Sequence, residues 1–461
     1  MKHLKTLIFA ILFSTLFYNQ NIGLNLSLFT ILTILAIGIT NKEAYTDKSV
    51  IIKAIAYIIT GVTIFLFKTD LTIYANILAF FTFIGSVSEK KSSIYINWIN
   101  GMYTTVVSVF SKHFDNLNSE VKKVKKEKIN YSYWIKIIAI PSIILIIFIN
   151  LYRSGNPMFN DIILQLDFSF INLNWLLFTG LGFYLFNNIT NPIQIEPITT
   201  TDINTGNYLV KNALKEISDI KIKEEKQLGN VLMLLLNGLI VLFLITYVMH
   251  LSEIHNMVAS QLSTQVHNGV NALILSNLLA IAIILFLFRG HLNFYDKIKD
   301  LKNLTFIWIL LNLCIVIVTI VINIEYIISF GLTYKRIGVL FFLTITSTGL
   351  ITTLIKVSKI KNLWFLFRKN TQIAFALLVL ASTINWDKII TYYNINNADQ
   401  MDLKYLIELS NNNTFLLKDY SEKNEIKAED ERKINIKHNE YLGYLQNNSW
   451  QEMVLDNIKI R

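Results

Sequence analysis

Three of the chain's seven histidines lie in one short polar segment, together with a glutamate. The residues are His250, Glu253, His255 and His267. His250 and Glu253 are three positions apart, so they share one face of a continuing helix. Imidazole nitrogens and carboxylate oxygens bind Zn²⁺, which makes these four residues a candidate metal site. Their spacing matches no established zinc pattern, and the favoured interpretation is a metal-free polar loop without a cofactor.

Two further groups are candidates for contact with an anion or a lipid. Arg289 ends an apolar segment just before Gly290, where its guanidinium is suited to a lipid phosphate or an anionic substrate. The alternative, which we favour, is a cationic helix end followed by a helix-ending glycine. The second group lies in a lysine-rich segment that predicts contact with anionic lipid of the inner leaflet: Lys122, Lys123, Lys125 and Lys126.

Glu325 and Arg336 flank a short loop that contains Gly331. We interpret them as a structural pair that closes a helical hairpin. The alternative is a coupled pair in a transport path. The hairpin interpretation is favoured because neither residue falls in the middle of an apolar segment.

The composition indicates a membrane protein. The chain has 461 residues, of which 53% are hydrophobic and 16% charged, whereas soluble domains have about 45–50% and about 25%. The chain contains no phosphate loop, nucleotide-binding glycine triplet, His-Glu-x-x-His pair or nucleophile elbow. Its single cysteine, Cys314, excludes a disulfide framework. A soluble enzyme is therefore excluded, and no motif supports an enzyme of any other kind.

Apolar segments long enough to approach a membrane span predict an all-α, polytopic fold with about eleven transmembrane helices. The spans are predicted near 4–18, 24–39, 50–67, 71–87, 134–152, 173–189, 228–249, 270–288, 304–324, 337–355 and 371–384. The segment 94–110 contains Asn97, Asn100 and Thr104, which are costly in lipid. We therefore predict an interfacial or partly buried helix there.

These segments divide the chain into four parts. We predict a four-span bundle with the interfacial helix over 1–110, a basic cytoplasmic loop over 111–133 and a seven-span membrane domain over 134–385. A small helical tail follows over 386–461, where Leu403, Leu406 and Tyr441 belong to runs with helical spacing.

The distribution of charge predicts the orientation. Lysine and arginine concentrate in alternate loops, which places the N-terminus in the cytoplasm and the tail outside. The tail holds 10 Lys and Arg against 13 Asp and Glu, so the chain's net charge of +10 comes from the rest of the sequence. The positive charge therefore indicates inner-face loops rather than nucleic-acid binding.

Four segments resemble one known family: 267–276, 288–294, 331–339 and 385–406, including His267-Asn268-Gly269 and Asn385-Trp386-Asp387. The resemblance is to an uncharacterised bacterial multi-pass membrane family, the domain of unknown function 4173, which is related to the 4153 group. It covers about 228–405, and the N-terminal half matches only in hydropathy. It implies a bacterial inner-membrane protein and supplies no substrate, cofactor or catalytic residue.

Together these features predict a non-enzymatic membrane component, such as a sensor, an envelope-assembly factor or a regulatory scaffold. The tail is the candidate surface for an envelope protein partner, and the bilayer with its anionic inner-leaflet lipid is the other predicted partner. The second hypothesis is a secondary transporter or channel for a small solute or ion. The third is a membrane-embedded metal-dependent enzyme, which depends on the histidine segment alone.

Overall fold

The structure is a computed structural model that describes residues 2–107, 141, 144–145, 147–149, 151–159, 172–211, 218–251, 269 and 275–460. Within these ranges the elements are helices, and one isolated antiparallel bridge joins Tyr208 to Lys361. The chain divides into two compact units. The first comprises Met1–Tyr18 and Thr105–Asn188, and the second comprises Asn19–Thr104 and Ile189–Arg461.

The first unit contains two apolar helices, α1 (Lys2–Phe17) and α9 (Leu173–Ile189). They coincide with the predicted first and sixth apolar segments. The Ser14 and Thr179 hydroxyls are 2.8 Å apart, and the Phe13 and Phe178 rings stack with centroids 5.2 Å apart. Small polar groups and aromatic packing therefore join the two helices.

The second unit begins with α2 (Leu24–Thr40), η1 (Lys42–Thr46), α3 (Lys48–Leu66) and α4 (Asp70–Ser88). The buried Asn76 amide on α4 donates to Thr30 at 3.1 Å and to Thr60 at 3.2 Å. Ser27 on α2 donates to the Gly61 carbonyl at 2.7 Å. Interhelical hydrogen bonds of this kind stabilise helix association where no water competes.

Helix α5 (Ile94–Val106) packs closely against α4. A Cβ on Gly85 would lie 2.0 Å from the Asn97 carbonyl oxygen, and one on Gly101 would lie 2.1 Å from that of Phe81. Only glycine permits backbones to approach so closely. Asn97, Asn100 and Thr104 are all buried, and Asn100 bonds Thr199 at 3.0 Å. The polar residues that argue against a lipid-exposed span are therefore satisfied within the protein.

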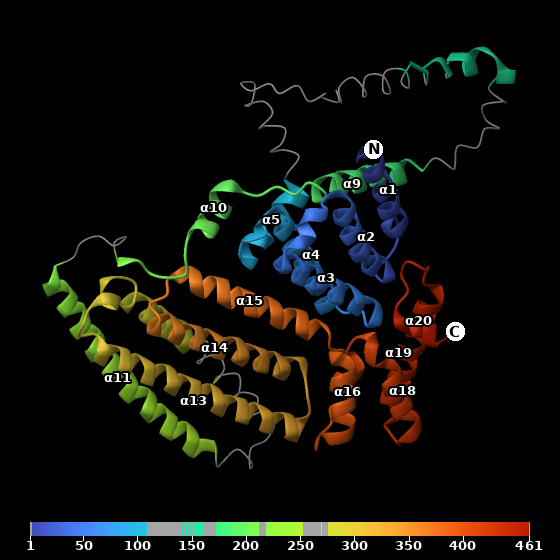
Figure 1. Ribbon diagram of the computed structural model, residues 1–461. Coiled ribbons are helices and arrows are strands. Elements are labelled where there is room, and N and C mark those ends of the chain that lie inside the picture. Colours follow the sequence, from blue (N-terminus) through green and yellow to red (C-terminus); the bar gives the residue numbers. More distant parts are fainter. Residues whose placement is uncertain are drawn as a thin grey trace, which may run out of the picture. The chain divides into compact units, whose positions relative to one another are not determined.

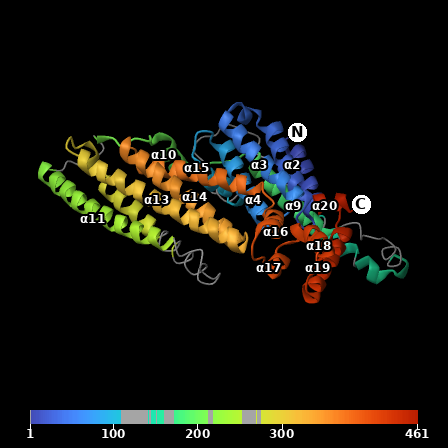
Figure 2. The same ribbon diagram turned by 90° about the horizontal axis from the view of Figure 1, so that it is seen from below.

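A row of long helices forms the rest of the second unit's apolar part (Figure 1, Figure 2). It contains α11 (Asp219–Leu251), the helix Leu275–Leu287, α13 (Lys299–Phe330), α14 (Tyr334–Ser358) and α15 (Leu363–Ser382), with η4 (His291–Phe294) between the second and third. Asn237 on α11 donates to the Leu304 carbonyl on α13 at 3.0 Å. Helix α15 also packs on α3 and α4, so it joins the two groups of helices.

The tail forms short helices, as the spacing of its apolar residues predicts. They are α16 (Trp386–Asn397), α17 (Leu403–Glu408), η5 (Asn411–Asn413), α18 (Thr414–Lys423), α19 (Ala428–Asn447) and α20 (Leu455–Lys459). Leu406, Leu417 and Ile434 are buried in a cluster that also includes Ile337 of α14. The tail therefore shares its apolar core with the end of a long helix.

Six helices in the described ranges are long and apolar enough to cross a membrane: α3, α4, α11, α13, α14 and α15. Helices α1, α2 and Leu275–Leu287 are apolar but shorter. Large apolar side chains face outward along these helices, including Leu234, Leu242 and Leu310. Water-exposed surfaces rarely carry apolar area so continuous. The fold is thus helical and membrane-like, and the count of eleven spans remains a prediction.

Candidate functional site

An open pocket of about 900 Å³ lies in the second unit, between α3 and α15. The segment Lys91–Ile94, helix α10 (Glu196–Asn204) and Asn207 complete its wall. One side of the lining is polar and rich in cations: Lys53, Lys91, Arg368 and Lys369, with Ser49, Ser92, Ser93 and Gln372. The other side is apolar: Ile52, Ile55, Ala56, Ile59, Phe375, Ala376, Val379 and Leu380. We call this end of the second unit the pocket end.

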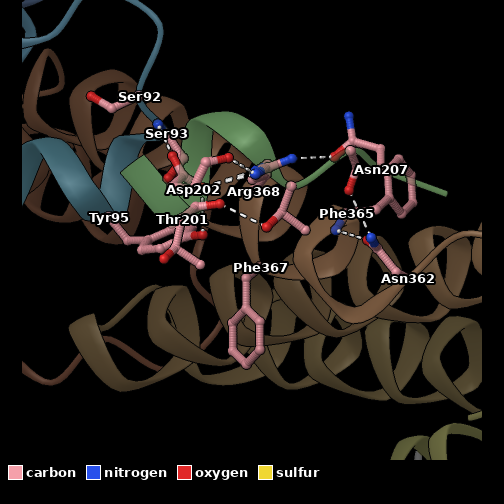
Figure 3. A network of polar contacts seen from close by, with 12 residues as sticks. Ser92, Ser93, Tyr95, Thr201, Asp202, Asn207, Asn362, Phe365, Phe367 and Arg368 are labelled. Carbon is pink, nitrogen blue, oxygen red and sulfur yellow. Dashed lines mark hydrogen bonds and ion pairs between the residues drawn. The ribbon is translucent and has the colours of Figure 1, made fainter. Parts of the chain in front are cut away.

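A buried ion pair holds the polar side of the pocket together (Figure 3). The side chain of Asp202 on α10 is only 2% exposed, and its Oδ1 lies 3.0 Å from the guanidinium of Arg368 on α15. Tyr95 donates its hydroxyl to the same oxygen at 2.9 Å, and the Ser93 N–H donates to Oδ2 at 2.8 Å. Arg368 also donates to Asn207 Oδ1 at 2.7 Å. Three segments distant in sequence, around Ser93, Asp202 and Arg368, therefore meet at one carboxylate.

The environment of Asp202 keeps this carboxyl ionised. Burial alone would raise its pKa, but the hydrogen bonds from Ser93, Tyr95 and Arg368 outweigh that effect and lower the pKa below its usual value. Because Arg368 and Asp202 neutralise each other, the pair adds no net charge to the pocket. The positive charge that remains belongs to Lys53, Lys91 and Lys369.

Lys53 differs from the other cations of the pocket because it is buried. The residue is 6% exposed and lines the cavity from the second turn of α3. No hydrogen bond or ion pair holds its ammonium within the ranges that the structure describes. By contrast, the buried Lys356 on α14 donates to the Phe288 carbonyl at 2.7 Å and so stabilises a helix end. A buried cation in a membrane-like helix is by default a candidate functional residue.

The opposite end of the second unit, which we call the tail end, is held by hydrogen bonds from the tail. Lys68, in the loop between α3 and α4, donates to the Ile22 carbonyl at 3.0 Å and to the Tyr444 hydroxyl at 2.8 Å. Glu452 accepts from the Asn21 N–H at 2.6 Å. A Cβ on Gly23 would lie 2.1 Å from the Glu452 carbonyl oxygen, so the backbones are in direct contact.

A second buried carboxylate, Asp387, organises the tail end. It accepts from the Tyr334 hydroxyl at 2.8 Å and from the Asn412 amide at 3.3 Å, and the Ser410 hydroxyl also donates to it. Asp387 lies in the first turn of α16, where a negative charge is favourable. The hydrogen-bond donors to Asp387 within the described ranges are neutral, whereas Asp202 also accepts from the Arg368 guanidinium.

The structure brings together two of the segments that carry the family resemblance. The Asn394 amide of α16 donates to the Leu332 carbonyl at 2.9 Å, and Tyr334 Oη donates to Asp387. The Tyr334 N–H donates to the Tyr405 hydroxyl at 2.9 Å. Gly331 has φ of +82°, in the left-handed region that favours glycine. These residues join the α13–α14 loop to the tail.

The predicted site residues are described only in part. His250 lies on the last turn of α11, while Glu253, His255 and His267 lie outside the described residues, as do Lys122, Lys123, Lys125 and Lys126. The zinc site and the lysine-rich lipid contact therefore remain predictions.

Arg289 and Arg336 both have partners in the structure. Arg289 lies 2.9 Å from Glu225 and donates to the Phe286 carbonyl at 2.7 Å, close to the end of its helix. The helix-end interpretation of Arg289 stays a prediction, as does its alternative of anion or lipid contact. Arg336 donates to the Phe330 carbonyl at 2.8 Å and lies over the Tyr326 ring, 3.8 Å from its centroid. Arg336 therefore closes the loop after α13, and its pairing with Glu325 remains a prediction.

Sequence reasoning missed Lys53, Asp202 and Arg368. The available indication was Lys53 itself, a single cation within the apolar run Ile51-Ile52-Lys53-Ala54-Ile55. Asp202 and Arg368 are 166 positions apart, and nothing in their local sequence distinguishes them from other loop charges. Only packing places them together.

The fold and the site define a helical, membrane-like protein with a cationic, half-apolar pocket at one end. The chain belongs to the family described as Domain of unknown function (DUF4153), which matches residues 6–420. The match includes the N-terminal half, so it extends well beyond the predicted 228–405. Comparison with curated proteins and with solved structures finds no match.

Proposed function

We propose that this chain is a non-enzymatic integral protein of the bacterial inner membrane that presents its helical tail outside as a rigid docking surface for an envelope protein. In this proposal it acts as a sensor, assembly factor or regulatory scaffold. About eleven helices cross the bilayer, the N-terminus is cytoplasmic, and residues 386–461 form an extracytoplasmic domain. The resemblance of four segments to the related 4173 group is part of this proposal.

The observation that carries the proposal is the fixed attachment of the tail. Its contacts reach Asn21, Lys68 and Leu332, which lie in three separate loops that the charge distribution predicts to be outside. A tail attached at three loops loses little conformational freedom when a partner binds, which favours recognition. Exposed apolar residues on its surface, Ile436, Trp450 and Ile458, provide contact area for a partner.

The pocket end supports the same orientation. The Lys90 ammonium donates to the Glu43 carbonyl at 2.8 Å, and Asn362 donates to the Gly206 carbonyl at 2.6 Å. These contacts join loops that are all predicted to be cytoplasmic. The loops that meet at each end of the second unit are thus all predicted to lie on the same side of the membrane. A consistent membrane topology requires this.

Two experiments test this proposal. A reporter that is active only outside the cytoplasm, fused after Arg461, should be active; activity of a cytoplasm-only reporter there would overturn the topology. Photo-crosslinkers at Ile436, Trp450 and Ile458 should each trap the same extracytoplasmic protein, whereas one at the buried Leu417 should trap none. The adducts should disappear in Gly23→Leu, which separates the tail from its loops. Absence of adducts at all three exposed positions would contradict the scaffold role.

A second candidate function is transport. A smaller pocket of about 290 Å³ lies beside the middle of α14 and is lined by Asn277, Thr346 and Asn370 among apolar residues. Uptake of small solutes into vesicles containing the purified protein, abolished by Thr346→Phe, would support transport over the scaffold. The metal-dependent enzyme would require bound Zn²⁺ in purified protein that is lost in His255→Ala.

A further inference from the structure

The pocket between α3 and α15 combines three properties that point to one class of ligand. It has an excess of positive charge, a buried lysine that no described residue binds by a hydrogen bond or ion pair, and a continuous apolar wall. Its volume of about 900 Å³ lies within the range of about 300–1,000 Å³ that is typical of small-molecule sites.

The charge of the pocket selects an anion. Among the described residues that line it are four cations, Lys53, Lys91, Arg368 and Lys369, and a single carboxylate, Asp202. Asp202 is already paired with Arg368 at 3.0 Å, and the Lys369 ammonium has a neutral neighbour, Gln372, at 3.3 Å. Asp47 caps the start of α3 through the Ser49 N–H at 2.7 Å, and its charge offsets only part of the excess.

The apolar wall selects a ligand with hydrocarbon chains. Ile52, Ile55 and Ile59 belong to α3, and Phe375, Val379 and Leu380 belong to α15. Both helices are long and apolar enough to span a membrane. A free phosphate would fill only the polar side and leave this wall uncovered. Basic pockets between membrane helices, close to the headgroup region, are sites for anionic phospholipids.

Lys53 lies at the junction of the two sides. It is five residues after the start of α3, roughly 8 Å along the axis at 1.5 Å per residue. Lysine side chains at this depth reach toward the headgroup region while their methylene groups stay in apolar surroundings. The Lys53 ammonium is therefore placed where a phosphate would lie if its acyl chains followed the isoleucines of α3.

We propose that this pocket binds an anionic glycerophospholipid from the leaflet that surrounds the pocket end, with its phosphate on Lys53 and its acyl chains along α3 and α15. The Asp202–Arg368 pair holds α10 and α15 together beside the headgroup. Because Asp202 is paired with Arg368, it does not neutralise the charge of Lys53. This proposal is independent of the scaffold role and of which side of the membrane the pocket end faces.

The test uses the full-length protein in zwitterionic nanodiscs or detergent, with phosphatidylglycerol as the probe. Native mass spectrometry counts bound lipid, and the shift in melting temperature gives the affinity. The wild type should retain phosphatidylglycerol and be stabilised by it, and Lys53→Gln should bind about tenfold more weakly, as expected for the loss of one charge-assisted contact. Lys48→Gln, the same change at an exposed lysine of α3 outside the pocket, should behave like the wild type.

Further arms distinguish the ligand sources. Phosphatidylcholine should bind weakly because it has no net charge, and inorganic phosphate and glycerol phosphate should bind weakly because they lack acyl chains. Equal binding of any of these would overturn the proposal, as would equal affinity of wild type and Lys53→Gln. Ala56→Phe keeps every charge but places a larger side chain in the apolar part of the pocket. This variant should therefore also bind phosphatidylglycerol more weakly. Ala56→Phe decides the question if Lys53→Gln fails to fold, and unchanged binding by Ala56→Phe would overturn the proposal.

Discussion

Two buried carboxylates, one at each end of the second unit, show how the same group can serve different tasks. Asp387 at the tail end is 1% exposed, and its hydrogen-bond donors in the described part of the chain are the neutral groups of Tyr334, Ser410 and Asn412. Asp202 at the pocket end is 2% exposed and is paired with a guanidinium. The tail end is thus a closed junction, whereas the pocket end keeps a neutral pair beside cations that are still available to a ligand.

The contrast between the two ends shows that burial of a polar group does not by itself identify a binding site. The tail end also contains buried polar groups, but its cation Lys68 donates to Tyr444 and its buried Asn394 donates to Leu332. At the pocket end the cation Lys53 lacks a partner among the described residues and faces a cavity. A ligand can bind at the pocket end because Lys53 lacks such a partner in the described part of the chain and a cavity lies beside it.

The largest effect is expected from Asp202→Asn. The change leaves the Arg368 guanidinium, whose side chain is 19% exposed, without its counter-charge. Removing one partner of a buried pair costs roughly 3 kcal/mol. The free energy of unfolding in detergent should fall accordingly, whereas Glu196→Gln, at an exposed acid on the same helix, should change it little. Equal effects of the two substitutions would mean that the pair does not fix α10 to α15.

The next largest effect is expected within the tail, from Lys437→Met. The Lys437 ammonium donates to the Ile407 carbonyl at 2.9 Å, the Leu409 carbonyl at 2.7 Å and Asn413 Oδ1 at 2.9 Å. Buried acceptors left without a donor cost about 2 kcal/mol. Proteolysis of the tail should accelerate in this variant. Lys433→Met, four residues earlier on the same helix and exposed, is the matched control and should leave the rate unchanged.

Asp387→Asn should have a smaller effect than Asp202→Asn, and this pair of variants tests the comparison directly. The hydrogen-bond donors to Asp387 among the described residues are neutral, and an amide oxygen still accepts one hydrogen bond, so the main loss is the charge that the Lys437 ammonium senses from a distance. We expect a loss of about 1 kcal/mol, seen as a lower melting temperature of the tail. A loss larger than that of Asp202→Asn would reverse the distinction between the two ends.

The smallest effect is expected from mild acid. Because the pKa of Asp202 is lowered in the folded chain, its contribution to stability is fully present above the unfolded value of about 3.9 and is lost as the pH falls through the lower folded value. Between pH 7 and pH 5 the Asp202–Arg368 contact should therefore stay intact. A difference in the free energy of unfolding between wild type and Asp202→Asn that stays constant from pH 7 to pH 5 would show that the contact is intact. Opening already at pH 5 would contradict the lowered pKa.

The sequence alone determined which residues form helices in most of the molecule. Apolar segments such as 50–67, 71–87 and 304–324 became α3, α4 and α13, because a run of apolar residues of this length is soluble in lipid only as a helix. The helical spacing around Leu406 and Tyr441 likewise became α17 and α19. These features depend on residues that are close in the sequence, so they can be predicted without knowledge of the tertiary contacts.

The charged residues that form the pocket could be identified only from the packing of the helices. Lys53 was an isolated cation in an apolar run, and Asp202 and Arg368 were two loop charges among many. The roles of these three residues depend on partners up to 166 positions away in the sequence. They also depend on a cavity whose wall is built from several segments. Helix formation is governed by near neighbours along the chain, whereas the balance between charge and counter-charge is set by packing. The sequence therefore indicated a membrane protein, and the fold located its candidate binding site.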